Sequence, residues 1–257
     1  MPGPAGIPIM KTRHVVALSF VVASLSVAAP RVDAQLAAPG ASGVVMGHLH
    51  LTGKDAAASR EFWTALSAAP VQNGTLQLLQ VPGTFVMVRQ GQPSAGTQGS
   101  TVDHVTCRVK DAKQARVATA PDGLMVHLVA DPSLDSAIRM DSISIMTIAP
   151  EETQAWYVKQ FGATAAKSGA ILTGKLPGVT LEFSKAETAP AGTRGRALDH
   201  IGFEVRNLEE FCKKLEAAGI KLDRPYTKLP NSMTAIAFLT DPWGTYIELT
   251  ENLAPAK

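Results

Sequence analysis

The strongest constraint on the fold is an eight-residue pattern that occurs twice in the chain. Residues 102–109 read V-D-H-V-T-C-R-V and residues 198–205 read L-D-H-I-G-F-E-V, with an Asp-His pair at the same place in both. A second match supports a duplication, because P-G-T-F-V-M-V at 82–88 resembles P-G-V-T-L-E-F at 177–183. Self-similarity of this kind indicates repeated structural units.

The repeats divide the chain into four modules that start near Val44, Thr101, Met140 and Leu198. Each opens with a strand of alternating polarity and continues through an amphipathic helix into further strands, and the order in the fourth module is βαβββ. The second module is expected to be truncated, with a helix around residues 111–120 followed by one convincing strand at 124–129. The pattern predicts an α+β fold built from tandem modules.

The N-terminal segment has the pattern of an export signal. A basic patch at 11–14 precedes an apolar stretch at 15–29, and Val32-Asp33-Ala34 offers small residues for a signal peptidase. We therefore expect a signal peptide at residues 1–34, cleavage before Gln35, and a periplasmic or secreted protein. The apolar stretch is shorter than the roughly 20 residues that span a bilayer, so no stable membrane anchor is expected.

Composition excludes two further classes. The formal net charge is +2, with 18% charged residues, and no Lys/Arg run is interleaved with aromatic residues, so a nucleic-acid-binding role has no electrostatic basis. Cys107 and Cys212 are too few for a disulfide framework, and both lie at apolar positions of their predicted elements. We expect both to be buried free thiols.

Three motifs resemble the vicinal oxygen chelate superfamily, which contains glyoxalase I, extradiol dioxygenases and bleomycin-resistance proteins. They are H-L-H-L-T-G-K-D at 48–55, D-H-I-G-F-E-V at 199–205 and D-P-W-G-T-Y-I-E-L at 241–249. The resemblance implies paired βαβββ modules that form two bowl-shaped mixed sheets with helices outside, and a divalent metal on the concave face. We assign a first glyoxalase-like domain to residues 44–139 and a second to 140–253.

In the second of these domains, strand alternation places His200, Glu248 and Glu182 on the face opposite the core. Burying such groups without a partner would cost several kcal/mol, and a metal ion would satisfy all three. The resemblance to glyoxalase sites implies that the first and last strands of each module supply ligands, which are the places these residues occupy. The fourth such position is Ser142, a poor ligand that we expect to be open to water or substrate.

The first domain offers a different set. His48, His104 and His127 occupy the matched positions, His50 lies nearby as a spare ligand or substrate contact, and Met87 stands where an acid is expected. Three neutral imidazoles can hold Zn²⁺ or Fe²⁺. A single strand histidine is more often a structural hydrogen-bonding residue, so the prediction rests on the set rather than on any member. The extradiol pattern of two His and one Glu is complete in neither half.

Two functions remain open from the sequence. The first is a metalloenzyme using Zn²⁺, Mn²⁺, Fe²⁺ or Ni²⁺ as a Lewis acid on a small oxygenated molecule, with Glu182 or Glu248 as the catalytic base and Arg108 as a substrate contact. The second is a metal-free binding or sequestering protein of the bleomycin-resistance kind. Either would act on a small molecule as a monomer or homodimer.

Overall fold

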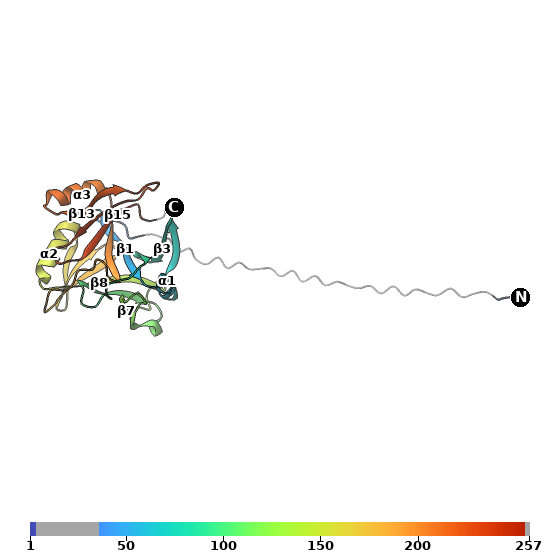
Figure 1. Cartoon of the computed structure of the whole chain (residues 1–257). Helices are drawn as coiled ribbons and strands as arrows, with labels where there is room; N and C mark the ends of the chain where they lie inside the picture. The colour runs from blue at the N-terminus through green and yellow to red at the C-terminus, as the bar shows by residue number, and fades with distance from the viewer. Residues whose placement is uncertain (4–35, 255–257) are drawn as a thin grey trace. The chain divides into compact units, whose positions relative to one another are not determined.

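Two mixed β-sheets carry the fold in the computed structural model, which describes residues 1–3 and 36–254. Most of the predicted signal peptide and its cleavage site before Gln35 lie outside the described residues. Among the described residues, no helix is long and apolar enough to cross a membrane. Figure 1 labels several of the helices and strands and colours the chain from blue at the N-terminus to red at the C-terminus.

The eight-stranded sheet joins the first module to the fourth (Figure 1). Its strand order is β13-β14-β15-β12-β1-β4-β3-β2, and it is mixed because β1 runs antiparallel to β12 and parallel to β4. The first module supplies β1 (Val44–Gly53), β2 (Ala69–Asn73), β3 (Leu76–Val81) and β4 (Thr84–Gln90). The fourth supplies β12 (Leu198–Val205), β13 (Leu222–Lys228), β14 (Ala235–Thr240) and β15 (Tyr246–Glu251).

The seven-stranded sheet joins the second module to the third, in the order β6-β7-β5-β8-β11-β10-β9. The second module supplies β5 (Val102–Val109), β6 (Arg116–Thr119) and β7 (Met125–Ala130). The third supplies β8 (Ile138–Thr147), β9 (Thr164–Ser168), β10 (Ile171–Leu176) and β11 (Val179–Lys185). The predicted α+β fold of two mixed sheets is therefore confirmed.

The sheets do not follow the predicted division into residues 44–139 and 140–253. Each sheet takes one module from each half, because β1 pairs with β12 and β5 pairs with β8. The halves also bond directly, since the amide of Met46 donates to the carbonyl of Pro177 and the amide of Met140 donates to the carbonyl of Pro82, both at 2.9 Å. Sequence similarity identified equivalent modules, but it carried no information on which modules share a sheet.

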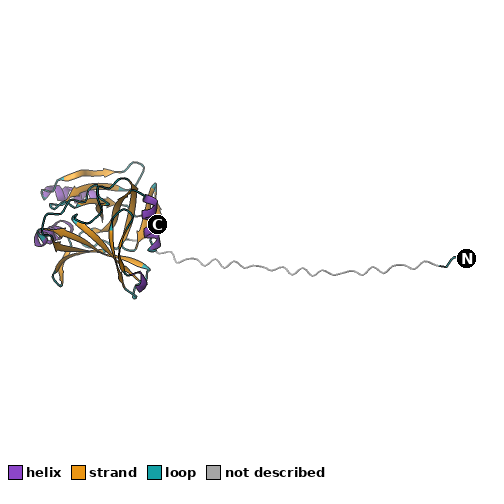
Figure 2. Cartoon of the chain, turned by 60° about the horizontal axis from the view of Figure 1, so that its bottom comes forward, coloured by secondary structure: helices purple, strands orange, loops and turns teal. Residues whose placement is uncertain are grey.

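The three α-helices of the described residues lie at the periphery of the strands (Figure 2). They are α1 (Ala56–Ala65), α2 (Pro150–Phe161) and α3 (Leu208–Ala217). The Asp55 carboxylate caps α1 by accepting from the amide of Ala58, and Gly162 ends α2 in the left-handed conformation. As predicted, α3 buries Cys212 on its apolar face, and Cys107 is also buried.

The second module departs from the predicted helix at 111–120. The structure has a 3₁₀-helix η1 (Ala112–Gln114) followed directly by β6, which pairs antiparallel with β7. The segment is too short for both a full helix and a strand, and the hydrogen bonds to β7 favour the strand. Compared with βαβββ, this module therefore lacks the α-helix and one strand. It keeps two strands after β5, where the sequence predicted one.

Candidate metal centre

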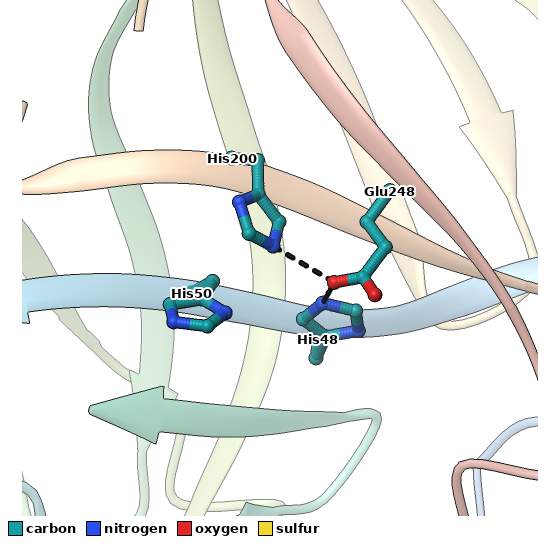
Figure 3. Close-up of side chains that lie close together, drawn as sticks. All are labelled: His48, His50, His200 and Glu248. Atoms are coloured by element: carbon teal, nitrogen blue, oxygen red, sulfur yellow. Dashed lines mark hydrogen bonds and ion pairs between the residues drawn. The ribbon is translucent and has the colours of Figure 1, made fainter. Parts of the chain in front are cut away.

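Four side chains converge on one face of the eight-stranded sheet (Figure 3). His48 and His50 come from β1, His200 from β12 and Glu248 from β15, and their potential ligand atoms all lie within 4.8 Å of one another. The Glu248 Oε2 accepts hydrogen bonds from the Nε2 of His48 at 3.0 Å and of His200 at 2.9 Å. His48, His200 and Glu248 are buried, and His50 is partly exposed.

Strand register and one glycine bring these groups together. His50 pairs with His200, and His48 pairs with Gly202, which in turn pairs with Glu248 on the next strand. A Cβ atom at Gly202 would lie 2.1 Å from the Cε1 of His48, closer than any real contact. The missing side chain at Gly202 therefore leaves the space that the His48 ring occupies.

A β-bulge adds a further acid to the site. The register of β12 against β1 shifts between His200 and Leu198, so Asp199 is the extra residue. Its Oδ1 lies 2.6 Å from the Nδ1 of His200, and its Oδ2 accepts from the Gly195 amide at 2.7 Å. His200 is thus held at both ring nitrogens, by Asp199 and by Glu248.

The charges of the cluster stabilise one another. Burial by itself would raise the pKa of Glu248, but the hydrogen bonds from His200 and His48 outweigh it and hold that pKa well below its ordinary value. Burial would lower the pKa of His200, but the bonds to Asp199 and Glu248 raise it. Burial and the neighbouring His200 and His48 lower the pKa of His50 to about 3, so this imidazole is neutral near pH 7.

The donor set and its spacing suit a divalent cation. Metal bonds of about 2.1 Å at right angles place neighbouring ligand atoms about 3.0 Å apart, close to the spacing between Glu248 and its two histidines. The Asp199 carboxylate on the far nitrogen of His200 repeats the carboxylate–histidine arrangement that orients metal-binding imidazoles. Within the described part of the chain, the buried Nδ1 atoms of His48 and His50 have no hydrogen-bond partner, so both rings retain unused binding capacity.

A pocket of about 370 Å³ opens above this cluster. Its wall next to the metal-ligand candidates contains His50, His200, Asp199 and Glu248, whereas His48 lies beneath them and does not line it. The remaining wall is apolar or aromatic apart from two arginines and two threonines: Leu76, Met87, Arg89, Arg194, Leu229, Thr234, Ile236, Phe238, Tyr246, Thr250 and Leu253. The volume falls within the range of small-molecule sites.

The other predicted site residues lie in the seven-stranded sheet. The rings of His104 on β5 and His127 on β7 stack with their centroids 3.7 Å apart, and the His104 Nδ1 bonds the Asp103 carboxylate at 2.9 Å. Ser142 pairs with Thr106 of β5, and Glu182 of β11 pairs with Ser144 of β8. Arg108 forms an ion pair with Asp141 at 3.1 Å.

The predicted grouping of ligands by sequence half is therefore wrong. Glu182 lies in a different sheet from His200 and Glu248, and His104 and His127 lie in a different sheet from His48. Burial and the adjacent His104 lower the pKa of His127, while the charge of Glu182 opposes this shift. Among the described residues, the cluster of His48, His50, His200 and Glu248 is the one with three or more ligand atoms within metal-binding reach.

Several residues of the site were missed from the sequence. Asp199 was not predicted because strand alternation places its side chain on the opposite face from His200. The Asp-His pair that recurs at 103–104 could have indicated its role. Arg89 and Arg194 are exposed residues without a motif. Glu204, which shares the alternating strand with His200, is structural: it accepts from the Thr250 hydroxyl at 2.6 Å and from the Leu253 amide at 3.3 Å.

Comparison with known proteins agrees with this architecture. Residues 139–249 match the family model described as Glyoxalase/Bleomycin resistance protein/Dioxygenase superfamily. A search of curated protein sequences gave no match.

Solved structures with the same fold cover most of the chain. A glyoxalase I variant from Zea mays superposes with a TM-score of 0.65 at 15% identity, covering 82% of this chain and 94% of the other. A Bacillus subtilis protein proposed to be a dioxygenase superposes with a TM-score of 0.62 at 12% identity, covering 82% and 86%. At these identities the likeness establishes the fold alone.

Proposed function

Since this chain belongs, through residues 139–249, to the glyoxalase/bleomycin resistance protein/dioxygenase superfamily, we propose that it is a divalent-metal-dependent enzyme. The substrate would be a small oxygenated organic molecule bound in the pocket above His50, His200 and Glu248. The observation that carries the proposal is the buried Glu248 carboxylate between the Nε2 atoms of His48 and His200.

The ligand set favours one group of metals and reactions. Two imidazoles and one carboxylate with open positions on one side form the facial triad of non-haem Fe²⁺ oxygenases, and Mn²⁺, Ni²⁺ and Zn²⁺ also accept these donors. A bound ion would act as a Lewis acid toward chelated substrate oxygens, and Fe²⁺ would add the ability to react with O₂. Met87 stands at the position equivalent to Glu182, so this site lacks the second carboxylate expected for glyoxalase-type proton transfer. We therefore favour oxygenase chemistry.

The chain's own residues have separable tasks. His48, His200 and Glu248 would bind the ion, and Asp199 fixes the ring of His200 through its Nδ1. Phe238 and Tyr246 stack on each other and both meet His200 edge-on, at 5.4 and 5.6 Å between centroids. His50 lies 4.5 Å from His200 between ring centroids and lines the pocket, where its neutral imidazole can accept a hydrogen bond from a substrate hydroxyl.

One observation favours a second candidate, a metal-free small-molecule binder. Glu248 is already satisfied by two imidazoles without an ion, so the cluster can be stable as a hydrogen-bonded core. The two candidates differ in whether the cluster holds stoichiometric metal.

Metal loading of matched variants tests the proposal. The purified protein is incubated anaerobically with Fe²⁺ and, separately, with Mn²⁺, Ni²⁺ and Zn²⁺, desalted and analysed for bound metal. We expect one ion per chain in the wild type, loss of binding in Glu248→Gln, and unchanged binding in Glu182→Gln, which makes the same substitution in the other sheet. A wild type that retains none of the four ions would refute the enzyme and favour the binder.

We further propose that the protein is exported and works in the periplasm or outside the cell, on the strength of the signal-like pattern at residues 1–34. Expression of the full chain with its own N-terminus should give a mature species outside the cytoplasm whose first residue is Gln35. A product that stays in the cytoplasm with the leader intact would contradict export.

A further inference from the structure

Two arginines in the pocket have no acidic partner in the described part of the chain. Arg89 and Arg194 line the same cavity as the ligand cluster, and neither is ion-paired to a carboxylate of the described residues. Among the residues that the structure describes, Arg89 donates to the Thr52 hydroxyl alone, at 3.2 Å, and the guanidinium of Arg194 lies over the ring of Tyr246, 4.6 Å from its centroid. Both cationic groups therefore keep donors available for a ligand.

The acids of the pocket cannot neutralise them. Glu248 is bonded to two imidazoles, and Asp199 is bonded to His200 and to the amide of Gly195. A divalent cation on the cluster would add further positive charge beside the two guanidiniums. A cavity with this charge balance favours an anionic ligand over a neutral one.

The remaining residues of the pocket wall indicate that the uncharged part of this ligand is apolar. Leu76, Met87, Ile236 and Leu253 give apolar surface, and the stacked pair of Phe238 and Tyr246 forms an aromatic wall next to His200. A planar guanidinium matches a planar carboxylate through two parallel N–H···O hydrogen bonds, which an exposed lysine would not provide.

Building on the proposed function, we propose that the substrate is an apolar, ring-bearing carboxylate. Its vicinal oxygens would face the His/Glu cluster, and its carboxylate would be bound by Arg194 and Arg89. Arg194 is pre-oriented by its contact with Tyr246, so less side-chain entropy is lost when it binds the anion.

Matched probes test this assignment. Isothermal titration is carried out with 3,4-dihydroxybenzoate and 3,4-dihydroxybenzamide, which differ in charge but little in size, on the Fe²⁺-loaded protein without oxygen. We expect the carboxylate to bind on the order of 10-fold more tightly or better, in line with one good charged bidentate contact. The preference should fall several-fold in Arg194→Gln and in Arg89→Gln and disappear in the double variant.

The control variant is Arg116→Gln, an exposed arginine at the start of β6 in the other sheet. It should keep the full preference. Equal binding of the two probes by the wild type, or a preference that survives in the double arginine variant, would overturn the proposal. Tighter binding of phenylphosphonate than of benzoate would also overturn it, in favour of a tetrahedral anion.

A second pair of probes separates this inference from the metal proposal. Benzoate and benzamide lack vicinal hydroxyls and are titrated into chelator-treated protein, where the arginines alone decide the preference. A benzoate preference there, with no metal bound by the untreated protein, would refute the metalloenzyme and leave the carboxylate site standing. Full metal binding without any preference for benzoate would refute the carboxylate site and leave the metalloenzyme proposal standing.

Discussion

The two sheets are built from equivalent strands, yet only one of them gathers a ligand cluster among the described residues. In the eight-stranded sheet His48 faces Gly202, and in the seven-stranded sheet the equivalent pair is Ser142 and Thr106. The large imidazole of His48 faces a glycine, which has no side chain, whereas the small side chain of Ser142 faces the branched side chain of Thr106. The comparison shows that a ligand position in this fold is a property of a pair of facing residues on neighbouring strands.

The acidic and basic side chains at equivalent positions also differ between the two sheets. The last strand of the fourth module carries Glu248, and the equivalent strand of the second module carries His127, which stacks on His104. A carboxylate between two imidazoles pulls them together through hydrogen bonds, whereas among the described residues no carboxylate bridges His104 and His127: Asp103 bonds His104, and Glu182 acts on His127 through its charge. The first arrangement is suited to binding a cation, and the second loses that attraction.

The largest effect is expected from filling the space at Gly202. Gly202→Ala would place a Cβ atom 2.1 Å from the His48 ring, which must move out of the cluster. We expect metal affinity to fall on the order of 10-fold or more and the free energy of unfolding to fall by about 1–3 kcal/mol, as for overpacked cores. Thr106→Ala, at the equivalent position, should change stability by less than about 1 kcal/mol. Metal titration and urea unfolding of both variants measure this, and a Gly202→Ala protein with wild-type affinity would break the facing-pair explanation.

The sequence predicted the modules and their strands far better than their pairing. The strands at 102–109 and 198–205 are found with the predicted boundaries, because alternation is a local signal. The pairing of β1 with β12 depends on contacts about 150 residues apart, for which a single sequence carries no local signal. That long-range pairing is what brings His48 to Glu248 and completes a two-His, one-Glu set that neither half contains.

Bulges explain the remaining errors at the site. Alternation assumes that successive side chains point to opposite faces, and the extra residue of a bulge breaks that rule. Asp199 and Asp103 each lie at such a register shift and bond the histidine that follows. The repeated Asp-His pair was visible in the sequence, but its geometry required the register of the neighbouring strand.

A smaller effect is expected from the pH dependence of stability in the metal-free protein. The pKa of His50 is lowered from 6.5 to about 3, so below pH 6.5 the unfolded chain binds a proton that the folded chain does not. The free energy of unfolding therefore falls as the pH falls from 6.5 toward 3, and His50→Gln removes this contribution. Between pH 7 and pH 4.5 the free energy of unfolding should fall less in the variant than in the wild type, by up to about 2 kcal/mol.

His127 provides the matched comparison in the other sheet. Burial and His104 lower its pKa in the same direction, but this imidazole is less deeply surrounded by protein than that of His50, so His127→Gln should flatten the profile less than His50→Gln does. Urea unfolding of both variants in the presence of chelator at pH 7 and pH 4.5 tests whether His50→Gln has the larger effect. A larger flattening in His127→Gln would show that the two histidine environments have been ranked wrongly.

The smallest effect is expected at Arg108, and it tests why the arginines of the two sheets differ. The Arg108 guanidinium is paired with Asp141 at 3.1 Å, and its side chain is 37% exposed, so Arg108→Gln should change the free energy of unfolding by about 0–1 kcal/mol. Because its charge is already paired with Asp141 and it lies in the other sheet, the variant should leave the binding of 3,4-dihydroxybenzoate unchanged, whereas Arg194→Gln should weaken it. If Arg108→Gln weakened binding as much as Arg194→Gln, the seven-stranded sheet would have to hold a ligand site of its own, and the contrast between a paired and an unpaired arginine would no longer identify the site.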